Sequence, residues 1–345
     1  MVQDVFVSGR ILTEQGFETG FINISTEEPF HIQRGSPPIS PIKKGIIVPS
    51  FFNTHTHVGD TFIRKRDVIL PHHLEELVAP PDGLKHKLLK NASETEIKQG
   101  INTALEEMMQ SGISLFCDFR ENGVNGAKLL KQLPQPADIT PIIYGRPERL
   151  TFDEKEFLDL IKVVDGIGLS SITDWQKDYL KLISGFAKKH NIPLALHVSE
   201  RIREDIDFIL SLEPDYVVHM TKGSKKDFEK LKQQNIPVVI CPRSNAFFGD
   251  QPPLNLMKKT GVELLLGTDN AMLHSLRIQD EIHFIQQHVP NVFSLERLLI
   301  MATYLSRKVL NLKDGMSRSN FPTSFLVLDE KTLEPIFISK AGLRG

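Results

Sequence analysis

The sequence predicts an α/β protein in which a (β/α)8 TIM barrel carries a small β-sandwich formed by both chain termini. Eight short apolar segments alternate with helical patterns between residues 46 and 312, which is the signature of parallel βαβ units. Both ends of the chain instead show short alternating bursts broken by Gly, Asn and Pro, a pattern typical of β-hairpins. A chain of 345 residues can bury the large core that a barrel needs.

The two termini are predicted to form one domain, because a C-terminal hairpin alone could not bury its apolar face. We place the two parts of this sandwich at residues 1–48 and 318–345, with the barrel at residues 49–317 between them. The segment from Val58 to Ala92 makes an unusually long first connection of the barrel. A connection of this length is more often a functional lid than a linker.

The predicted barrel strands are short and rich in Leu, Val and Ile. In chain order they cover residues 46–52, 114–119, 139–144, 166–169, 193–197, 216–219, 238–241 and 263–267. Glycines weaken the fourth of these predictions. Between the first two strands, the run Ser93-Glu94-Thr95-Glu96 predicts a capping box that opens a helix ending before Gly112.

Composition and charge argue against several classes of partner. A net charge of -2 provides no basic field, so neither nucleic acid nor an anionic membrane surface is an expected partner. No apolar stretch is long enough to span a membrane. Cys117 and Cys241 both lie in apolar runs, which favours buried reduced thiols and a cytoplasmic location. Homo-oligomerisation is left open.

His55 and His57 are the most informative residues, because they lie two apart at the end of the apolar run from Gly45 to Gly59. Residues i and i+2 of a strand project from the same face, so both imidazoles can converge on one point. Two neutral imidazoles on a strand can form half of a metal site. The alternative interpretation is a pair of packed or solvated histidines.

Later strand ends supply further metal-ligating side chains. His197 ends the fifth predicted strand and Asp269 follows the eighth. Because the C-terminal ends of barrel strands meet at one face, His55, His57, His197 and Asp269 can together hold one divalent ion, Zn2+ or Fe2+, with an open position for water. Such an ion lowers the pKa of water towards about 7 and presents hydroxide to an electrophilic carbon.

Two further residues are candidates for proton transfer and hydrogen bonding. Glu200 lies three residues beyond His197, close enough to the mouth to carry a proton from water to a leaving nitrogen. His219 ends the sixth strand and is either a further ligand or a hydrogen-bonding partner of the reacting groups; we favour the second role.

Substrate contacts are predicted at the same face. Arg120, Arg146 and Arg243 each follow a predicted strand, where a guanidinium could bind a carboxylate or phosphate. The alternative for each arginine is an ion pair with a nearby acid. His274 lies in the loop after the eighth strand, which must border the site.

Taken together, these residues resemble the amidohydrolase superfamily, specifically its cytosine deaminase and chlorohydrolase-like branch. The resemblance spans nearly the whole chain and depends on PSFFNTHTH, HVSE, VVHM, CPRSN, LLLGTDN and the closing FLVLD. It implies one zinc or iron ion on the four ligands, with Glu200 and His219 as the acid/base pair and Asp269 as an additional base. Binuclear relatives carry a bridging lysine at the end of strand four, where this chain reads GIGLSS from 166 to 171.

The constellation predicts mechanism better than substrate. We expect a metal-dependent hydrolase that deaminates a nucleobase-like or related amino-heterocycle and releases ammonia. Hydrolysis of a cyclic amide, as in imidazolonepropionase-like enzymes, and displacement of chloride from a ring begin with the same attack on an sp2 carbon. A catalytically silent scaffold of the same fold is the alternative from another class.

Overall fold

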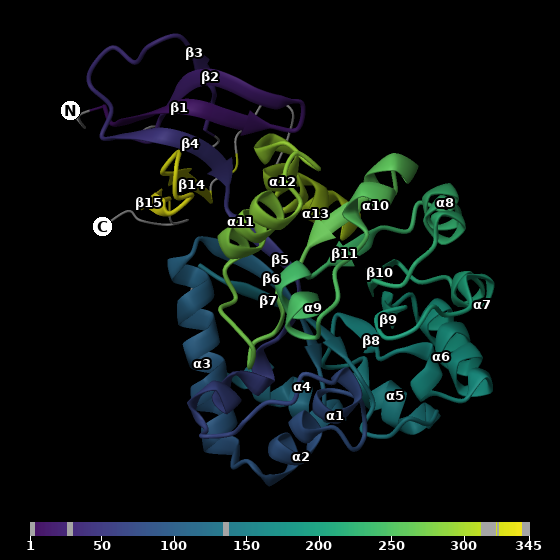
Figure 1. The fold of residues 1–345 in the computed structure, drawn as a ribbon. Coiled ribbons are helices and arrows are strands. Elements are labelled where there is room, and N and C mark those ends of the chain that lie inside the picture. The colour runs from purple at the N-terminus through teal and green to yellow at the C-terminus, as the bar shows by residue number, and fades with distance from the viewer. Residues whose placement is uncertain (1–3, 26–29, 134–137, 312–321, 323, 340–345) are drawn as a thin grey trace.

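The computed structural model describes residues 4–25, 30–133, 138–311, 322 and 324–339. Two β-sheets organise these residues, and Figure 1 shows the smaller sheet beside a larger body of strands and helices. The predicted boundary at residues 317 and 318 lies outside the described residues. Among the described helices, none combines the length and apolar character that crossing a membrane requires.

The smaller sheet joins both ends of the chain. Its six strands run in the order β15-β14-β4-β1-β2-β3, with β1 and β4 parallel and the other neighbours antiparallel. Their bounds are β1 Phe6–Thr13, β2 Gly16–Asn23, β3 Gln33–Arg34, β4 Lys43–Pro49, β14 Phe325–Leu328 and β15 Pro335–Ile338. As predicted, both ends of the chain contribute strands to one β-structure, which is a single shared sheet.

The larger sheet is curled, has nine strands and is parallel throughout, in the order β12-β11-β10-β9-β8-β7-β6-β5-β13. Its strands are β5 Phe51–His57, β6 Ile113–Arg120, β7 Thr140–Gly145, β8 Gly166–Leu169, β9 Leu194–Val198, β10 Tyr216–His219, β11 Val238–Ile240, β12 Leu264–Leu266 and β13 Asp269–Asn270. Only Gly267 and Thr268 separate β12 from β13, although these strands form opposite edges of the sheet. The chain at 264–270 therefore contacts both edges.

One predicted strand is divided in two. The pattern predicted a single strand over residues 46–52, but β4 ends at Pro49 in the smaller sheet and β5 begins at Phe51 in the larger one. The backbone N–H of Ser50 donates to Ser324, at 3.1 Å, whereas that of Phe51 donates to Gly112, at 2.9 Å. The apolar run continues through this change of partner, so periodicity alone could not locate it.

Helices separate most of the parallel strands along the chain. Their bounds are η1 Val58–Lys65, α1 Leu74–Leu77, α2 Leu84–Asn91, α3 Glu94–Gln110, α4 Gly123–Gln132, α5 Glu154–Leu160, η2 Ile172–Asp174, α6 Lys177–His190, α7 Ile206–Ser211, α8 Lys225–Gln233, α9 Pro242–Phe247, α10 Leu254–Thr260, α11 Ile278–His288, α12 Leu295–Met301 and α13 Tyr304–Val309. The segment 58–92, predicted to be a lid, contains η1, α1 and α2.

The start of α3 corrects the predicted capping box. The Ser93 side chain accepts a hydrogen bond from the backbone N–H of Glu96, at 3.2 Å, as expected for an N-cap. The carboxylate of Glu96 does not return to Ser93, because it forms a bidentate pair with Arg66, with distances of 2.8 and 2.7 Å. The charged partner from η1's C-cap therefore replaces the second half of the box.

The hydrophobic core lies mainly within and around the larger sheet. Its strands contribute almost continuously buried side chains, as expected for parallel strands that are covered on both faces. Cys117 and Cys241 are buried free thiols, in agreement with their predicted role as small apolar residues. A separate cluster, including Phe30, Phe325 and Val327, stabilises the smaller sheet.

Candidate active site

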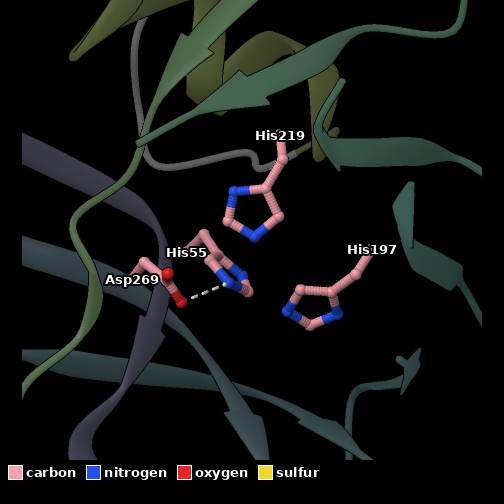
Figure 2. Close-up of side chains that lie close together, drawn as sticks. All are labelled: His55, His197, His219 and Asp269. Atoms are coloured by element: carbon pink, nitrogen blue, oxygen red, sulfur yellow. Dashed lines mark hydrogen bonds and ion pairs between the residues drawn. The ribbon is translucent and has the colours of Figure 1, made fainter. Parts of the chain in front are cut away.

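Four side chains from separate strands meet at the C-terminal end of the larger sheet. They are His55 from β5, His197 from β9, His219 from β10 and Asp269 from β13. One nitrogen or oxygen of each lies within 4.8 Å of the corresponding atoms of the others. Figure 2 shows the three imidazoles and the carboxylate turned towards a common centre.

The strand register explains how Asp269 reaches both histidines of β5. Asp269 is paired with Thr56, so its carboxylate lies between the side chains of the residues on either side. Its Oδ1 lies 3.2 Å from Nε2 of His55 and 3.4 Å from Nε2 of His57. Ser244 and Asn270 both donate hydrogen bonds to the other oxygen, Oδ2, at 2.5 and 2.8 Å.

His57 lies just outside the set of four but belongs to the same cluster. Its ring stacks against that of His197 with centroids 5.6 Å apart. Its Nδ1 contacts the Glu121 carboxylate at 2.9 Å, which leaves Nε2 facing Asp269. Burial is the main cause that lowers the pKa of His57 to about 4, so this imidazole is neutral near pH 7.

His197 is held in the tautomer that a metal ligand requires. Its Nδ1 donates to the backbone carbonyl of Leu169 at 2.7 Å, so Nε2 carries the free lone pair. Burial, followed by the neighbouring histidines, holds its pKa well below the usual range. The neutral ring is therefore available as a nitrogen ligand.

His219 and Glu200 form a linked pair through Asn245. The amide nitrogen of Asn245 lies 3.2 Å from both Nδ1 of His219 and Oε1 of Glu200. With Nδ1 as acceptor, neutral His219 carries its proton on Nε2, which lies 3.5 Å from Oε2 of Glu200. Burial, together with the charge of Asp269, raises the pKa of Glu200 well above its usual value.

The chemistry of this donor set fits a divalent cation. Nδ1 of His55 is fully buried and has no hydrogen-bond partner among the described residues. Burial raises the pKa of Asp269, but its hydrogen bond with His55 and the nearby histidines hold that pKa well below the usual value. Neutral imidazoles around an ionised carboxylate are ligands suited to a metal such as zinc.

The backbone around this cluster is conformationally unusual. Ser199, His219, Met220 and Asp269 have φ angles of 50°, 74°, 53° and 63°, in the left-handed region that favours glycine. Each of the four lies at or just beyond the end of a parallel strand, or at the short strand β13. Strained backbone of this kind clusters at functional sites, where the fold holds it in place.

A pocket opens over the cluster and is partly covered by the segment 58–92. Its wall includes the catalytic candidates His57, His197, Glu200, His219 and Asp269. The segment 58–92 contributes six further residues to the wall, namely Leu74, Val78, Ala79, Pro80, Lys85 and His86. A long first connection that covers the site is the arrangement expected of a lid.

Only one of the four predicted substrate contacts lines this pocket. Arg146 is part of its wall, whereas Arg120, Arg243 and His274 are not. Arg120 is buried and contacts Asp118 at 3.5 Å. Arg243 lies 3.4 Å from Asp280, and Nδ1 of His274 bonds the Ser275 carbonyl at 3.1 Å. The ion-pair alternative stated for the arginines describes Arg120 and Arg243.

Two residues of the site, Lys85 and Asn245, were not predicted as site residues, and only the second had a sequence signal. Lys85 lies in α2 and contacts Glu121, Asp60 and Asn270 at 2.7, 3.4 and 3.0 Å. It occurs in an irregular, charged segment whose position over the site depends on the tertiary fold. Asn245 belongs to the motif CPRSN, so its place in the motif, although not its contacts, could have been used.

Sequence comparison shows which known proteins this chain resembles. The sequence profile of the amidohydrolase family matches residues 46–340. An uncharacterized protein of Methanocaldococcus jannaschii is 34% identical, with 96% of this chain and 88% of that protein covered. The 5-methylthioadenosine/S-adenosylhomocysteine deaminase of Pyrococcus furiosus is 26% identical, with 80% and 73% covered.

Solved structures show the same architecture. The atrazine chlorohydrolase of Arthrobacter aurescens, in complex with zinc, superimposes with a TM-score of 0.70 at 14% sequence identity. The superposition covers 99% of this chain and 92% of that enzyme. At this level of identity the similarity is one of fold.

Proposed function

The chain belongs to the amidohydrolase family, and from this membership we propose that it is a metal-dependent aminohydrolase that deaminates an amino-heterocycle and releases ammonia. The single observation that carries the proposal is the meeting of His55, His197, His219 and Asp269 from four distant strands. The deaminase of Pyrococcus furiosus supports the choice of deamination, because it is named for removing an amino group from purine compounds.

One divalent ion, Zn2+ or Fe2+, is proposed to be held by His55, His57, His197 and Asp269. The short contacts of Asp269 with both β5 histidines and the tautomer of His197 support this set. An ion bound there lowers the pKa of water towards about 7 and so supplies a nucleophile at neutral pH. The same ion would satisfy the otherwise unpaired Nδ1 or Nε2 lone pairs of the buried rings.

The remaining residues move protons and stabilise charge during the reaction. Water adds to the ring carbon that bears the amino group, and Glu200 takes one proton from the attacking oxygen and returns it to the departing nitrogen. The Nε2–H of His219 donates to the oxygen as it gains negative charge. Asp269 takes the second proton and gives it up to the ring nitrogen, so that the C–N bond breaks, a carbonyl forms and neutral ammonia leaves.

The finer architecture is part of the same proposal. We propose that the curled sheet is a (β/α)8 barrel at residues 49–317, and that 1–48 and 318–345 form a β-sandwich. The contact of segment 264–270 with both edges of the larger sheet supports a closed barrel. Two buried free cysteines support a reducing, cytoplasmic location, and a small heterocycle is the proposed partner.

The proposal is tested by measuring ammonia release from a panel of amino-purines and amino-pyrimidines with zinc-loaded and iron-loaded protein. At least one compound is expected to release ammonia. Glu200→Gln should lower that rate about 100- to 10,000-fold, because it removes a general acid/base. Its metal content should equal that of wild type, and Glu213→Gln, at an exposed ion pair, is the matched control.

Two results would contradict the proposal. Turnover of an imidazolone, a hydantoin or a chlorinated triazine, without ammonia from any amino-heterocycle, would identify a cyclic amidase or chlorohydrolase instead. Failure of the purified protein to take up stoichiometric metal would favour a non-catalytic scaffold.

A further inference from the structure

We infer that Arg146 binds an anionic group, a carboxylate or a phosphate, carried by the substrate on the side away from the reacting carbon. This inference rests on the proposed function and narrows its substrate class. It depends on where Arg146 lies, on its lack of a partner and on the engagement of the acids around it.

Arg146 lies on a part of the pocket that contains none of the four clustered side chains. It directly follows β7, and β6, β7 and β8 lie between β5 and β9 in the sheet order. The clustered side chains come from β5, β9, β10 and β13. A ring held at the cluster therefore has its non-reacting substituents free to extend towards β7 and β8.

Arg146 is the one cationic side chain of the described pocket wall that has no acceptor for its charge. Lys85 and Arg201 are the other permanent cations there. Lys85 contacts Glu121 at 2.7 Å, and Arg201 contacts Asp174 at 2.9 Å. The guanidinium of Arg146 has neither a hydrogen bond nor an ion pair within the described parts of the chain, although its backbone is bonded to residues 120 and 123.

The acids near Arg146 are already occupied. Glu121 contacts both Lys85, at 2.7 Å, and His57, at 2.9 Å. Asp174 pairs with Arg201 and lies at the end of η2. Burial lowers the pKa of Arg146 below its usual value, and both acids act on its guanidinium only through longer-range charge. No carboxylate in the described part of the chain forms an ion pair with the guanidinium of Arg146.

A half-buried guanidinium without a partner is unfavourable for the folded protein, since an arginine stays charged and loses part of its hydration. An anion in the pocket would compensate for this lost hydration. The planar guanidinium can bind a carboxylate or phosphate through two parallel hydrogen bonds. Ser170 and Ser171, which line the pocket after β8, provide a polar surface beside it.

The test compares matched compounds that differ in an anionic group. Adenosine is paired with adenosine 5′-monophosphate, and pterin with pterin-6-carboxylate, so that phosphate and carboxylate are distinguished. Ammonia release and calorimetric binding are measured for zinc-loaded wild type, Arg146→Met and Arg146→Lys. Arg203→Met removes an arginine that lies outside the pocket wall and is the control.

In wild type, the anionic member of at least one pair is expected to bind more tightly than its neutral member by about 10- to 100-fold, the range for hydrogen bonds to charged groups. Arg146→Met should abolish this difference and leave binding of the neutral member unchanged within about threefold. Arg146→Lys should retain part of it, because lysine keeps the charge but loses the planar fork. Arg146→Met should melt no lower than wild type, since it removes an unpaired charge.

Equal binding of both members of each pair by wild type, or an unchanged preference in Arg146→Met, would overturn the inference. Ammonia release in such an experiment would still uphold the proposed function. Conversely, if no compound releases ammonia, the proposed function fails while calorimetry still decides whether Arg146 selects anions.

Discussion

At the scale of single residues, His57 is oriented by a chain of charged contacts that begins in the lid. Lys85 contacts Glu121, and Glu121 contacts Nδ1 of His57. Burial raises the pKa of Glu121, but the charge of Lys85 and the contact with His57 hold it well below the usual value. An ionised Glu121 at this distance favours the His57 tautomer that carries its proton on Nδ1, which leaves the lone pair of Nε2 facing Asp269.

Lys85→Met is therefore expected to weaken zinc binding by about 10- to 100-fold, the usual effect of removing a partner that orients a metal ligand. The substitution leaves Glu121 without its closest cation and frees it from its position against His57. Competition with a chromophoric chelator measures the affinity. Lys188→Met, at an exposed ion pair, is the control, and circular dichroism checks folding. A folded Lys85→Met protein with wild-type zinc affinity would contradict the orienting role.

The proposed metal ligands could be inferred from sequence, whereas the residues that support them could not. His55, His57, His197 and Asp269 lie near the C-terminal ends of strands or in β13, and a parallel sheet brings such positions together. Lys85 reaches the site from a short helix of the lid, whose packing no periodic pattern encodes. The partner of Arg243 depends on the tertiary structure, whereas Asp118 lies two residues before Arg120 on β6, where the two-residue period of a strand places both side chains on one face.

At the scale of elements, the lid segment 58–92 packs on the body of the protein through apolar side chains and is stabilised internally by a polar contact. Phe62, Ile63 and Leu77 pack with Met272 in a small separate cluster. His86 in α2 bonds the carbonyl of Val78 through Nε2, at 3.0 Å. Burial, followed by the charges of Arg146 and Lys85, lowers the pKa of His86 to about 3.

This depressed pKa makes lid stability depend on pH. An unfolded histidine takes up a proton near pH 6.5, whereas folded His86 does so only near pH 3. The stabilisation is complete above about pH 6.5 and is lost as the pH falls towards 3. His86→Gln can still donate a hydrogen bond to Val78. Between pH 7.5 and 5, its melting temperature should fall by less than that of wild type, with both proteins free of metal. Equal losses in both proteins would contradict this assignment.

Most elements of the larger sheet follow the sequence pattern closely. Strands β8 and β10 begin and end at the predicted residues, and β6, β7, β9, β11 and β12 differ by one position at one or both ends. The short strand β13 was not predicted, and the first predicted strand is the exception. That exception arises because the largely apolar stretch 46–52 is divided between β4 in one sheet and β5 in the other. The cap of α3 was half predicted, since Arg66 competes for the Glu96 carboxylate from a distant part of the sequence.

At the scale of the whole molecule, β14 connects the two hydrophobic cores. Leu326 and Leu328 belong to the large core around the curled sheet, whereas Phe325 and Val327 belong to the core of the smaller sheet. This alternation follows from the two-residue period of a strand. One strand of the smaller sheet therefore packs into both cores, and their stabilities are coupled.

Leu326→Ala is expected to lower the free energy of unfolding of the entire chain by about 2 to 5 kcal/mol, as for other buried leucines. Leu326 is fully buried and packs where a side chain on Gly112 would otherwise fit. Calorimetry should show one transition displaced to lower temperature. The control is Leu182→Ala, because Leu182 is 51% exposed. Loss of the smaller sheet in a separate early transition would show that the two cores unfold independently.

The left-handed backbone at His219 and Asp269 also has an evolutionary consequence. These conformations suit glycine or asparagine better than histidine or aspartate, so chemistry and thermal durability favour different residues at the same positions. A gene copy released from selection for turnover would therefore accept glycine most readily at those two positions, and its cluster would be lost there first.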